Sequence, residues 1–149
     1  MVWLPALFVA AAIFWFSAQP AEASTDMSDG VSRLLLWLAT KLHLIGEPTA
    51  GDYAMIEWMS MPVRKCAHIT EYLVLHLTLL FALYGQGIRG QKWLRTGLLL
   101  VFLYACTDEF HQLFVPGRAG LLTDVLIDSS GAALVTLVWG WRLGCGKKK

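Results

Sequence analysis

Three short stretches of the sequence place ionisable and polar side chains about one helical turn apart. These side chains are Arg64, His68, Glu71 and Tyr72 in the first stretch, Asp108, His111 and Gln112 in the second, and Asp124 and Asp128 in the third. Residues three or four apart lie on the same face of a helix. Histidine and carboxylate side chains can act as general bases, and guanidinium groups bind phosphate and carboxylate groups. The spacing therefore predicts a polar pocket, provided that the three helical faces meet.

The sequence around these stretches is strongly apolar. The chain has 149 residues, of which 56% are hydrophobic, and its net charge is +1. This apolar share exceeds that of soluble domains and the length suits one domain, so we predict a single membrane domain over residues 1–149. Four apolar runs approach the ~20 residues that cross a bilayer. They are Val2–Ala18, Cys66–Tyr84, Trp93–Phe114 and Leu121–Trp141.

The predicted fold is all-α, a polytopic bundle of four transmembrane helices. Inside a bilayer every backbone amide must be satisfied within its own segment, which favours helices. In the first outer loop, about residues 19–62, apolar residues recur at helical spacing from Val31 to Ile45. We therefore predict an amphipathic helix in the interface, with Ser28 or Asp29 as its cap and Gly46 at its end. A short re-entrant segment is the alternative. Pro62 is predicted to close a second apolar piece, Ala54–Met61.

Basic residues set the predicted orientation, because they gather on the cytoplasmic side of membrane proteins. With both termini in the cytoplasm, seven of the twelve basic residues lie inside, and all eleven acidic residues lie in the outer loop or the outer halves of the spans. The seven are Arg89, Lys92, Arg95, Arg142, Lys147, Lys148 and Lys149. The sequence Ala21-Glu22-Ala23 is also typical of a signal-peptidase site, and cleavage there would leave three spans. The long aromatic first run, which no basic residue precedes, favours retention of the first span.

The carboxylates of the three polar stretches lie at similar predicted depths. Given a rise of 1.5 Å per residue, Glu71, Asp108 and Asp128 each lie roughly 10 Å from the outer end of their helix. An ionised side chain at mid-membrane costs about 2.5–3.5 kcal/mol, so these groups are expected to point into the bundle. One interpretation is that Arg64 and its basic neighbours only neutralise them as internal ion pairs. The number of polar groups favours an outward-opening pocket that binds a ligand or carries out a reaction.

Four blocks of polar residues occur in order along nearly the whole chain. They are Phe16-Ser17-Ala18-Gln19-Pro20; Arg64-Lys65-Cys66-Ala67-His68-Ile69-Thr70-Glu71-Tyr72; Asp108-Glu109-Phe110-His111-Gln112 with Pro116-Gly117-Arg118; and Asp124-Val125-Leu126-Ile127-Asp128-Ser129-Ser130-Gly131. Together these blocks resemble the VanZ-like family. The resemblance implies a small protein of the bacterial cytoplasmic (inner) membrane, and the namesake of the family is linked to teicoplanin resistance. Two features depart from the family pattern: many relatives have Asn where Asp128 stands, and no second glycine follows Gly131 until Gly140.

The resemblance and the chemistry of the side chains assign two sets of roles. One set is expected to bind an anionic or peptide-bearing lipid headgroup, such as a lipid-linked cell-wall precursor, and comprises Arg64, Lys65, Tyr72, Glu109, Gln112, Arg118, Asp124 and Asp128. The other would supply acid–base catalysis of hydrolysis or transfer at that headgroup, and comprises His68, Glu71 and Asp108. A divalent metal between the second and third spans and a proton relay are narrower alternatives. No cofactor and no nucleic-acid partner is predicted, and the oligomeric state stays open.

Overall fold

The computed structural model of the chain describes residues 1–46 and 52–145. Over these residues it contains five helices and no strand, which confirms the predicted all-α class. The helices are α1 (Leu4–Ser17), α2 (Ala21–Lys41), α3 (Asp52–Gly85), α4 (Gly90–Gln112) and α5 (Leu122–Cys145).

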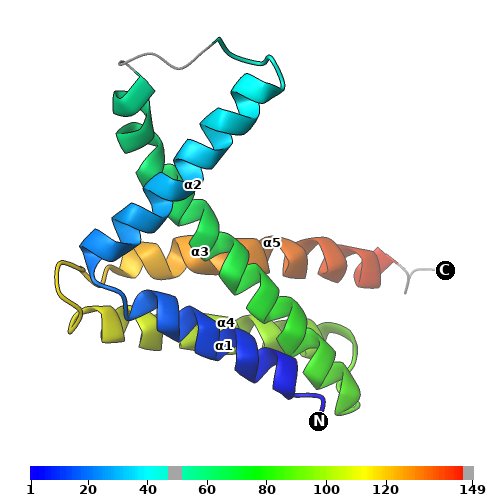
Figure 1. Cartoon of the computed structure of the whole chain (residues 1–149). Coiled ribbons are helices and arrows are strands. Elements are labelled where there is room, and N and C mark those ends of the chain that lie inside the picture. Colours follow the sequence, from blue (N-terminus) through cyan, green and yellow to red (C-terminus); the bar gives the residue numbers. More distant parts are fainter. Residues whose placement is uncertain (47–51, 146–149) are drawn as a thin grey trace.

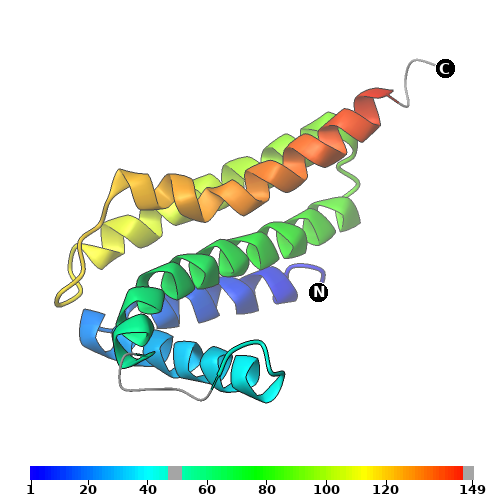
Figure 2. The ribbon, with the colours of Figure 1, turned by 90° about the horizontal axis from the view of Figure 1, so that it is seen from above.

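Helix α3 is the centre of the arrangement and packs against each of the other four helices. Figure 1 shows α1, α4 and α5 around one half of α3, while α2 crosses the other half. In Figure 2, α4 and α5 lie side by side. The N-terminus, the α3–α4 connection and the C-terminal end of α5 lie at one end of the bundle (Figures 1 and 2). The α1–α2 junction and the α4–α5 loop lie together at the opposite end.

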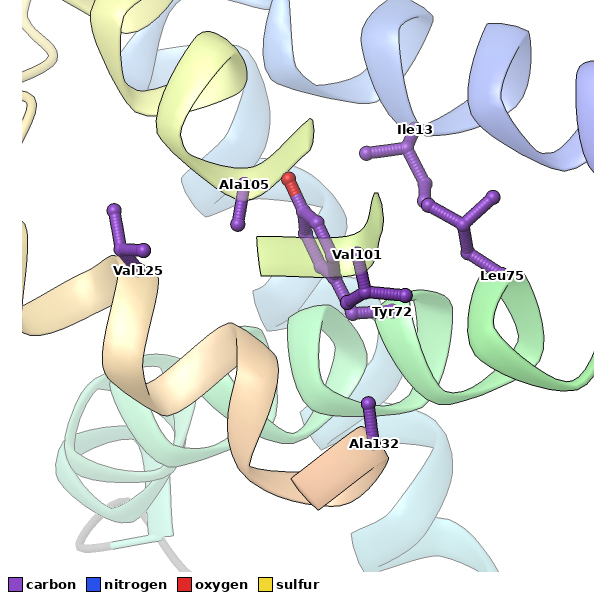
Figure 3. Packing of buried hydrophobic residues seen from close by; sticks show 7 residues of the cluster. All are labelled: Ile13, Tyr72, Leu75, Val101, Ala105, Val125 and Ala132. Carbon is purple, nitrogen blue, oxygen red and sulfur yellow. The ribbon is translucent and has the colours of Figure 1, made fainter. Parts of the chain in front are cut away.

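A small hydrophobic core joins α1, α3, α4 and α5 (Figure 3). Its buried members are Ile13, Tyr72, Leu75, Val101, Ala105, Val125 and Ala132. Outside this core, large apolar side chains are exposed on every helix, for example Phe8 on α1, Phe81 on α3, Leu103 on α4 and Leu126 on α5. An apolar surface of this extent requires an apolar environment, which a bilayer supplies.

Two helices of the described chain are long and apolar enough to cross a membrane: α3, over Ala54–Gly85, and α5, over Leu122–Gly144. Helices α1 and α2 make a third candidate if they count as one span, and they are bent by 108° at their junction. Helix α4 has 23 residues, but Arg95, Asp108 and Glu109 lower its apolar character. The structure thus supports a helical membrane protein with two or three candidate spans by length and composition.

Helix α2 differs from the predicted interfacial helix in its bounds and in its packing. It begins at Ala21, directly after Pro20, and ends at Lys41, so Ser28 and Asp29 lie inside it and do not cap it. Its buried residues are Ser24, Ser28, Ser32 and Leu36. Small residues four apart allow two helices to approach closely, and α2 packs on α3. Apolar residues that the sequence places on the predicted face, such as Val31 and Leu35, are exposed.

Helix α3 continues through Pro62, so the prediction that this proline closes a separate segment was wrong. A proline inside a helix removes one backbone hydrogen bond, which costs roughly 3 kcal/mol in a soluble helix. Membrane helices tolerate proline better, because neighbouring groups satisfy the freed carbonyl. The continuous helix places Met61, Arg64 and His68 on one rod.

The α4–α5 loop is tied to its surroundings by two glycines. Gly117 has a φ of +73°, a backbone conformation that suits glycine, and the loop carbonyl of Pro116 accepts a hydrogen bond from the Ala21 backbone N–H at 3.2 Å. At Gly120, a Cβ atom would lie 2.2 Å from the backbone oxygen of Glu109. The loop can therefore lie this close to α4 only without a side chain at position 120.

We predict that Gly120→Ala destabilises the protein by about 1–3 kcal/mol, because backbone atoms must move to admit the methyl group. The matched control is Gly30→Ala in α2, where no atom lies within 4 Å of the added Cβ. This control should leave stability unchanged or raise it by about 0.5–1 kcal/mol, since alanine favours a helix interior. Thermal unfolding of both variants in detergent measures the difference. Equal melting temperatures for the two variants would contradict the close packing at Gly120.

Candidate functional site

The buried carboxylate of Asp108 joins three helices. Its Oδ2 atom accepts a hydrogen bond from the Ser17 hydroxyl on α1 at 2.7 Å and another from the Tyr72 hydroxyl on α3 at 3.0 Å. The Gln112 amide, one turn along α4, lies 3.4 Å from the same oxygen. Figure 3 shows the Tyr72 hydroxyl reaching towards α4 near Ala105. Asp108 is only 3% exposed, so this carboxylate depends on these donors in place of water.

A cavity of about 220 Å³, here called the polar cavity, lies next to this network at the end of the bundle that holds the α4–α5 loop. It is bounded by α3, the last turn of α4, the α4–α5 loop and the first turns of α5. Its charged or polar lining residues are Arg64, Lys65, His68, Glu109, Gln112, Arg118, Asp124 and Asp128. Gln112 connects the two features, because it lines the cavity and also contacts Asp108.

Two of the three carboxylates in the polar cavity have a clear partner. Asp124 accepts a hydrogen bond from the Lys65 ammonium group at 2.7 Å, which forms an ion pair between α5 and α3. Glu109 accepts the backbone N–H of Leu121 at 2.9 Å, which fixes the start of α5 against α4. Asp128 is 3% exposed, and its Oδ2 atom has no hydrogen-bond partner within the described part of the chain.

The two arginines of the cavity are held by neutral oxygens. Arg64 donates through Nη2 to the Thr25 hydroxyl on α2 at 2.6 Å, and Arg118 donates through Nε to the Gln19 backbone oxygen at 3.3 Å. In residues 1–46 and 52–145, no carboxylate oxygen lies within 4.0 Å of either guanidinium. Burial lowers the pKa of Arg118, the nearby positive charge of Arg64 lowers it further, and the carboxylates of Asp108 and Glu109 partly oppose this shift. These two positive charges therefore lack a close counterion.

A second cavity, here called the apolar groove, has a volume of about 250 Å³ and lies between α2 and α3. Its lining residues are Phe16, Ser24, Met27, Ser28, Val31, Val63, Arg64, Ala67, His68, Glu71 and Arg118. Arg64, His68 and Arg118 line both cavities. The two cavities are thus neighbours that share a polar boundary.

The structure brings most of the predicted residues together. Eight of them line the polar cavity, and Glu71 lines the apolar groove. Tyr72 and Asp108 line neither cavity and lie buried in the hydrogen-bond network. The polar faces of α3, α4 and α5 do meet at one end of the bundle, as their spacing predicted. The expectation that carboxylates hold the basic residues applies to Lys65 but not to Arg64 or Arg118.

Three residues of α1, the α1–α2 junction and α2 contribute contacts that the sequence did not assign. Ser17 donates to Asp108, Gln19 accepts from Arg118, and Thr25 accepts from Arg64. Ser17 carries the one side-chain hydroxyl in the helix Leu4–Ser17. A single hydroxyl at the end of an otherwise apolar helix was the available signal, because such a group needs a partner inside the bundle.

The candidate acid–base and metal-binding residues are less closely assembled. His68 Nδ1 lies 4.0 Å from Glu71 Oε2, which is longer than a hydrogen bond. The His111 ring packs against Phe14, with 4.5 Å between the ring centroids. In the residues that the structure describes, no three His, Cys, Asp or Glu side chains are grouped so that they could hold a metal ion. The geometry therefore gives no support to the predicted metal alternative.

Comparison with known proteins identifies the class. The family model VanZ/LLP1 matches residues 2–143, nearly the whole chain, and the protein therefore belongs to this family. The resemblance inferred from the four polar blocks is confirmed. Comparisons with curated proteins and with solved structures found no significant match.

We predict that Asp108→Ala lowers the free energy of unfolding by about 1–3 kcal/mol, because the Ser17 and Tyr72 hydroxyls lose a buried acceptor. Asp26→Ala, at an exposed position of α2, is the matched control and should change stability little. A double-mutant cycle of Asp108→Ala with Ser17→Ala, followed by thermal unfolding, measures the coupling. Strictly additive effects would show that the hydrogen bond between α1 and α4 does not stabilise the fold.

Proposed function

We propose that this protein binds an anionic ligand of the cell envelope in the polar cavity. The observation that carries the proposal is the pair Arg64 and Arg118, which line the cavity and have no carboxylate oxygen of the described residues within 4.0 Å of their guanidinium groups. Guanidinium groups form paired, charge-assisted hydrogen bonds with phosphate and carboxylate groups. The Nε atom of Arg64 is buried and has no hydrogen-bond partner within the described residues. An anion between the two arginines would satisfy both charges.

The proposed ligand reaches the cavity from the extracytoplasmic side of a bacterial inner membrane. The α3–α4 connection, the start of α4 and the end of α5 lie at the end of the bundle that also holds the N-terminus (Figure 1). These segments carry the basic residues Arg89, Lys92, Arg95 and Arg142. By the positive-inside rule this end is cytoplasmic, and the polar cavity then faces outward. In this arrangement α1 and α4 complete a bundle of four spans with α3 and α5, and α2 lies at the outer interface.

Membership of the VanZ/LLP1 family suggests a ligand from the cell envelope. A lipid-linked cell-wall precursor or an anionic membrane lipid carries the phosphate groups that the two arginines suit, and both are present at this membrane surface. We therefore assign the protein a role in envelope homeostasis, including sensitivity to glycopeptides such as teicoplanin.

A second candidate function is acid–base hydrolysis or transfer at the same headgroup. His68 lines both cavities, and Glu71 lies one turn away on α3. A ligand that enters between them could draw the two side chains closer, since catalytic hydrogen bonds are often long without substrate. Asp108 would then act through Tyr72 and Gln112, because it does not line either cavity.

We expect the double variant Arg64→Ala, Arg118→Ala to bind anionic lipid at least about tenfold more weakly, because hydrogen bonds to charged groups contribute roughly 1.5–3 kcal/mol. Native mass spectrometry of the solubilised protein, titrated with phosphatidylglycerol, measures this binding. Arg33→Ala, at an exposed position of α2 that lines neither cavity, serves as the control. Unchanged lipid retention by the double variant, together with an unchanged teicoplanin sensitivity of cells, would refute the proposal.

The enzymatic alternative gives a separate expectation. His68→Gln and Glu71→Gln keep a polar group at each position, so both variants should still bind the anionic ligand. If the protein catalyses a reaction, turnover of a phosphate-linked lipid should fall by about 10²–10⁴-fold in these variants, the usual contribution of a general acid or base. Lipid products are measured by mass spectrometry after incubation with purified protein. Turnover that survives both substitutions would exclude these two residues from catalysis.

A further inference from the structure

We propose that the ligand is a lipid whose anionic headgroup binds Arg64 and Arg118 and whose hydrocarbon chain lies in the apolar groove between α2 and α3. This inference rests on the proposed function and adds the place where the hydrocarbon chain of the ligand binds.

The polar cavity and the apolar groove meet at shared lining residues. Arg64, His68 and Arg118 form the boundary between the polar cavity and the apolar groove. The cavities measure about 220 Å³ and about 250 Å³, and each alone is smaller than a usual small-molecule site of roughly 300–1,000 Å³. One ligand that occupies both would place its charge at the boundary and extend into the groove.

The walls of the groove are largely apolar. Away from the boundary they consist of Phe16, Met27, Val31, Val63 and Ala67, together with two serines of α2 and the carboxylate of Glu71, one turn from His68 on α3. Phe16 and Met27 are each 43% exposed and Val31 is 47% exposed, so these side chains leave the groove open to the exterior of the bundle. With α2 at the outer interface, this opening meets the boundary between lipid headgroups and acyl chains. A lipid chain can therefore enter from the side while its headgroup stays at the arginines.

The distribution of polar groups favours a lipid over a peptide. The groove is lined by four ionisable residues, Arg64, His68, Glu71 and Arg118. Three of them, Arg64, His68 and Arg118, also line the polar cavity. Of the two serines, Ser28 already donates its hydroxyl to the Ser24 backbone oxygen at 2.9 Å. An extended peptide in the groove would leave backbone N–H and C=O groups without partners, which costs free energy in an apolar site. A hydrocarbon chain has no such requirement.

Small residues keep the groove open. Ser24 and Ser28 belong to the serine face of α2 that packs on α3, and Ala67 is an exposed alanine of α3. A larger side chain at Ala67 would fill the groove without displacing a buried neighbour. Ala133 lines a third cavity, of about 420 Å³, between α4 and α5. Ala67→Phe therefore tests the apolar groove, and Ala133→Phe makes the same change in a different cavity as a control.

The experiment compares phosphatidylglycerol with sn-glycerol 3-phosphate, which has the phosphate group but no chain, by native mass spectrometry of the full-length protein in detergent. In the wild type, phosphatidylglycerol should bind at least about tenfold more tightly, because burial of even two methylene groups has this effect. Ala67→Phe should remove most of this advantage and leave sn-glycerol 3-phosphate binding unchanged. Ala133→Phe should change neither affinity.

A labelling experiment on the wild type covers the case in which Ala67→Phe does not fold. Phosphatidylglycerol with a diazirine in its acyl chain should label peptides that contain Met27, Val31 or Val63, and excess unlabelled phosphatidylglycerol should prevent the labelling.

Labelling spread evenly over exposed apolar residues, or equal effects of Ala67→Phe and Ala133→Phe, would overturn the inference. In that case sn-glycerol 3-phosphate binding that still requires Arg64 and Arg118 would leave the proposed function standing. Loss of that dependence would remove both.

Discussion

Hydrogen bonding to the buried Asp108 carboxylate is the interaction on which the rest of the arrangement depends. Ser17 and Tyr72 donate to one of its oxygens and thereby fix the end of α1 and the middle of α3 against α4. The α1–α2 junction follows directly after Ser17, so its backbone is placed beside the α4–α5 loop. There the Pro116 carbonyl accepts from the Ala21 N–H, and the Gln19 carbonyl accepts from Arg118. The position of the polar cavity is a consequence of these contacts.

The division of charge within the cavity explains why an anion suits it. Lys65 and Asp124 neutralise one another, Glu109 accepts the Leu121 backbone N–H just before α5, and Asp128 is buried with no partner for its Oδ2 atom in the described residues. Within residues 1–46 and 52–145, Arg64 and Arg118 donate only to neutral acceptors, Thr25 and Gln19. A fold that needed these arginines for stability alone would gain more from a carboxylate partner, because charge-assisted pairs form the stronger hydrogen bonds. We therefore interpret this pair, which lines both cavities, as the binding feature of the proposed site.

The apolar runs and the polar spacing allowed the all-helical class and the meeting of α3, α4 and α5 to be predicted, because both depend on local periodicity. The course of α2 could not be predicted in this way. Its serines four apart pack on α3 together with Leu36, while Leu34, Leu35 and Leu38 are exposed. Burial of serines beside exposed leucines reverses the usual relation of polarity to burial and follows from an apolar surrounding medium. The sequence also placed a helix boundary at Pro62, but α3 continues through it, because membrane helices tolerate proline better than soluble helices do. The partners of Arg64 and Arg118 are hydroxyl and carbonyl groups, which carry no charge signal in a sequence.

The most direct test of the account is an experimental structure of the protein in a bilayer that contains phosphatidylglycerol, at a resolution that shows side chains. We expect density for a phosphate group whose oxygens lie about 2.7–3.2 Å from guanidinium nitrogens of both Arg64 and Arg118. Continuous density should lead from this phosphate into the groove between α2 and α3. Direct pairing of either guanidinium with Glu109, Asp124 or Asp128, and no ligand density between the two arginines, would contradict it.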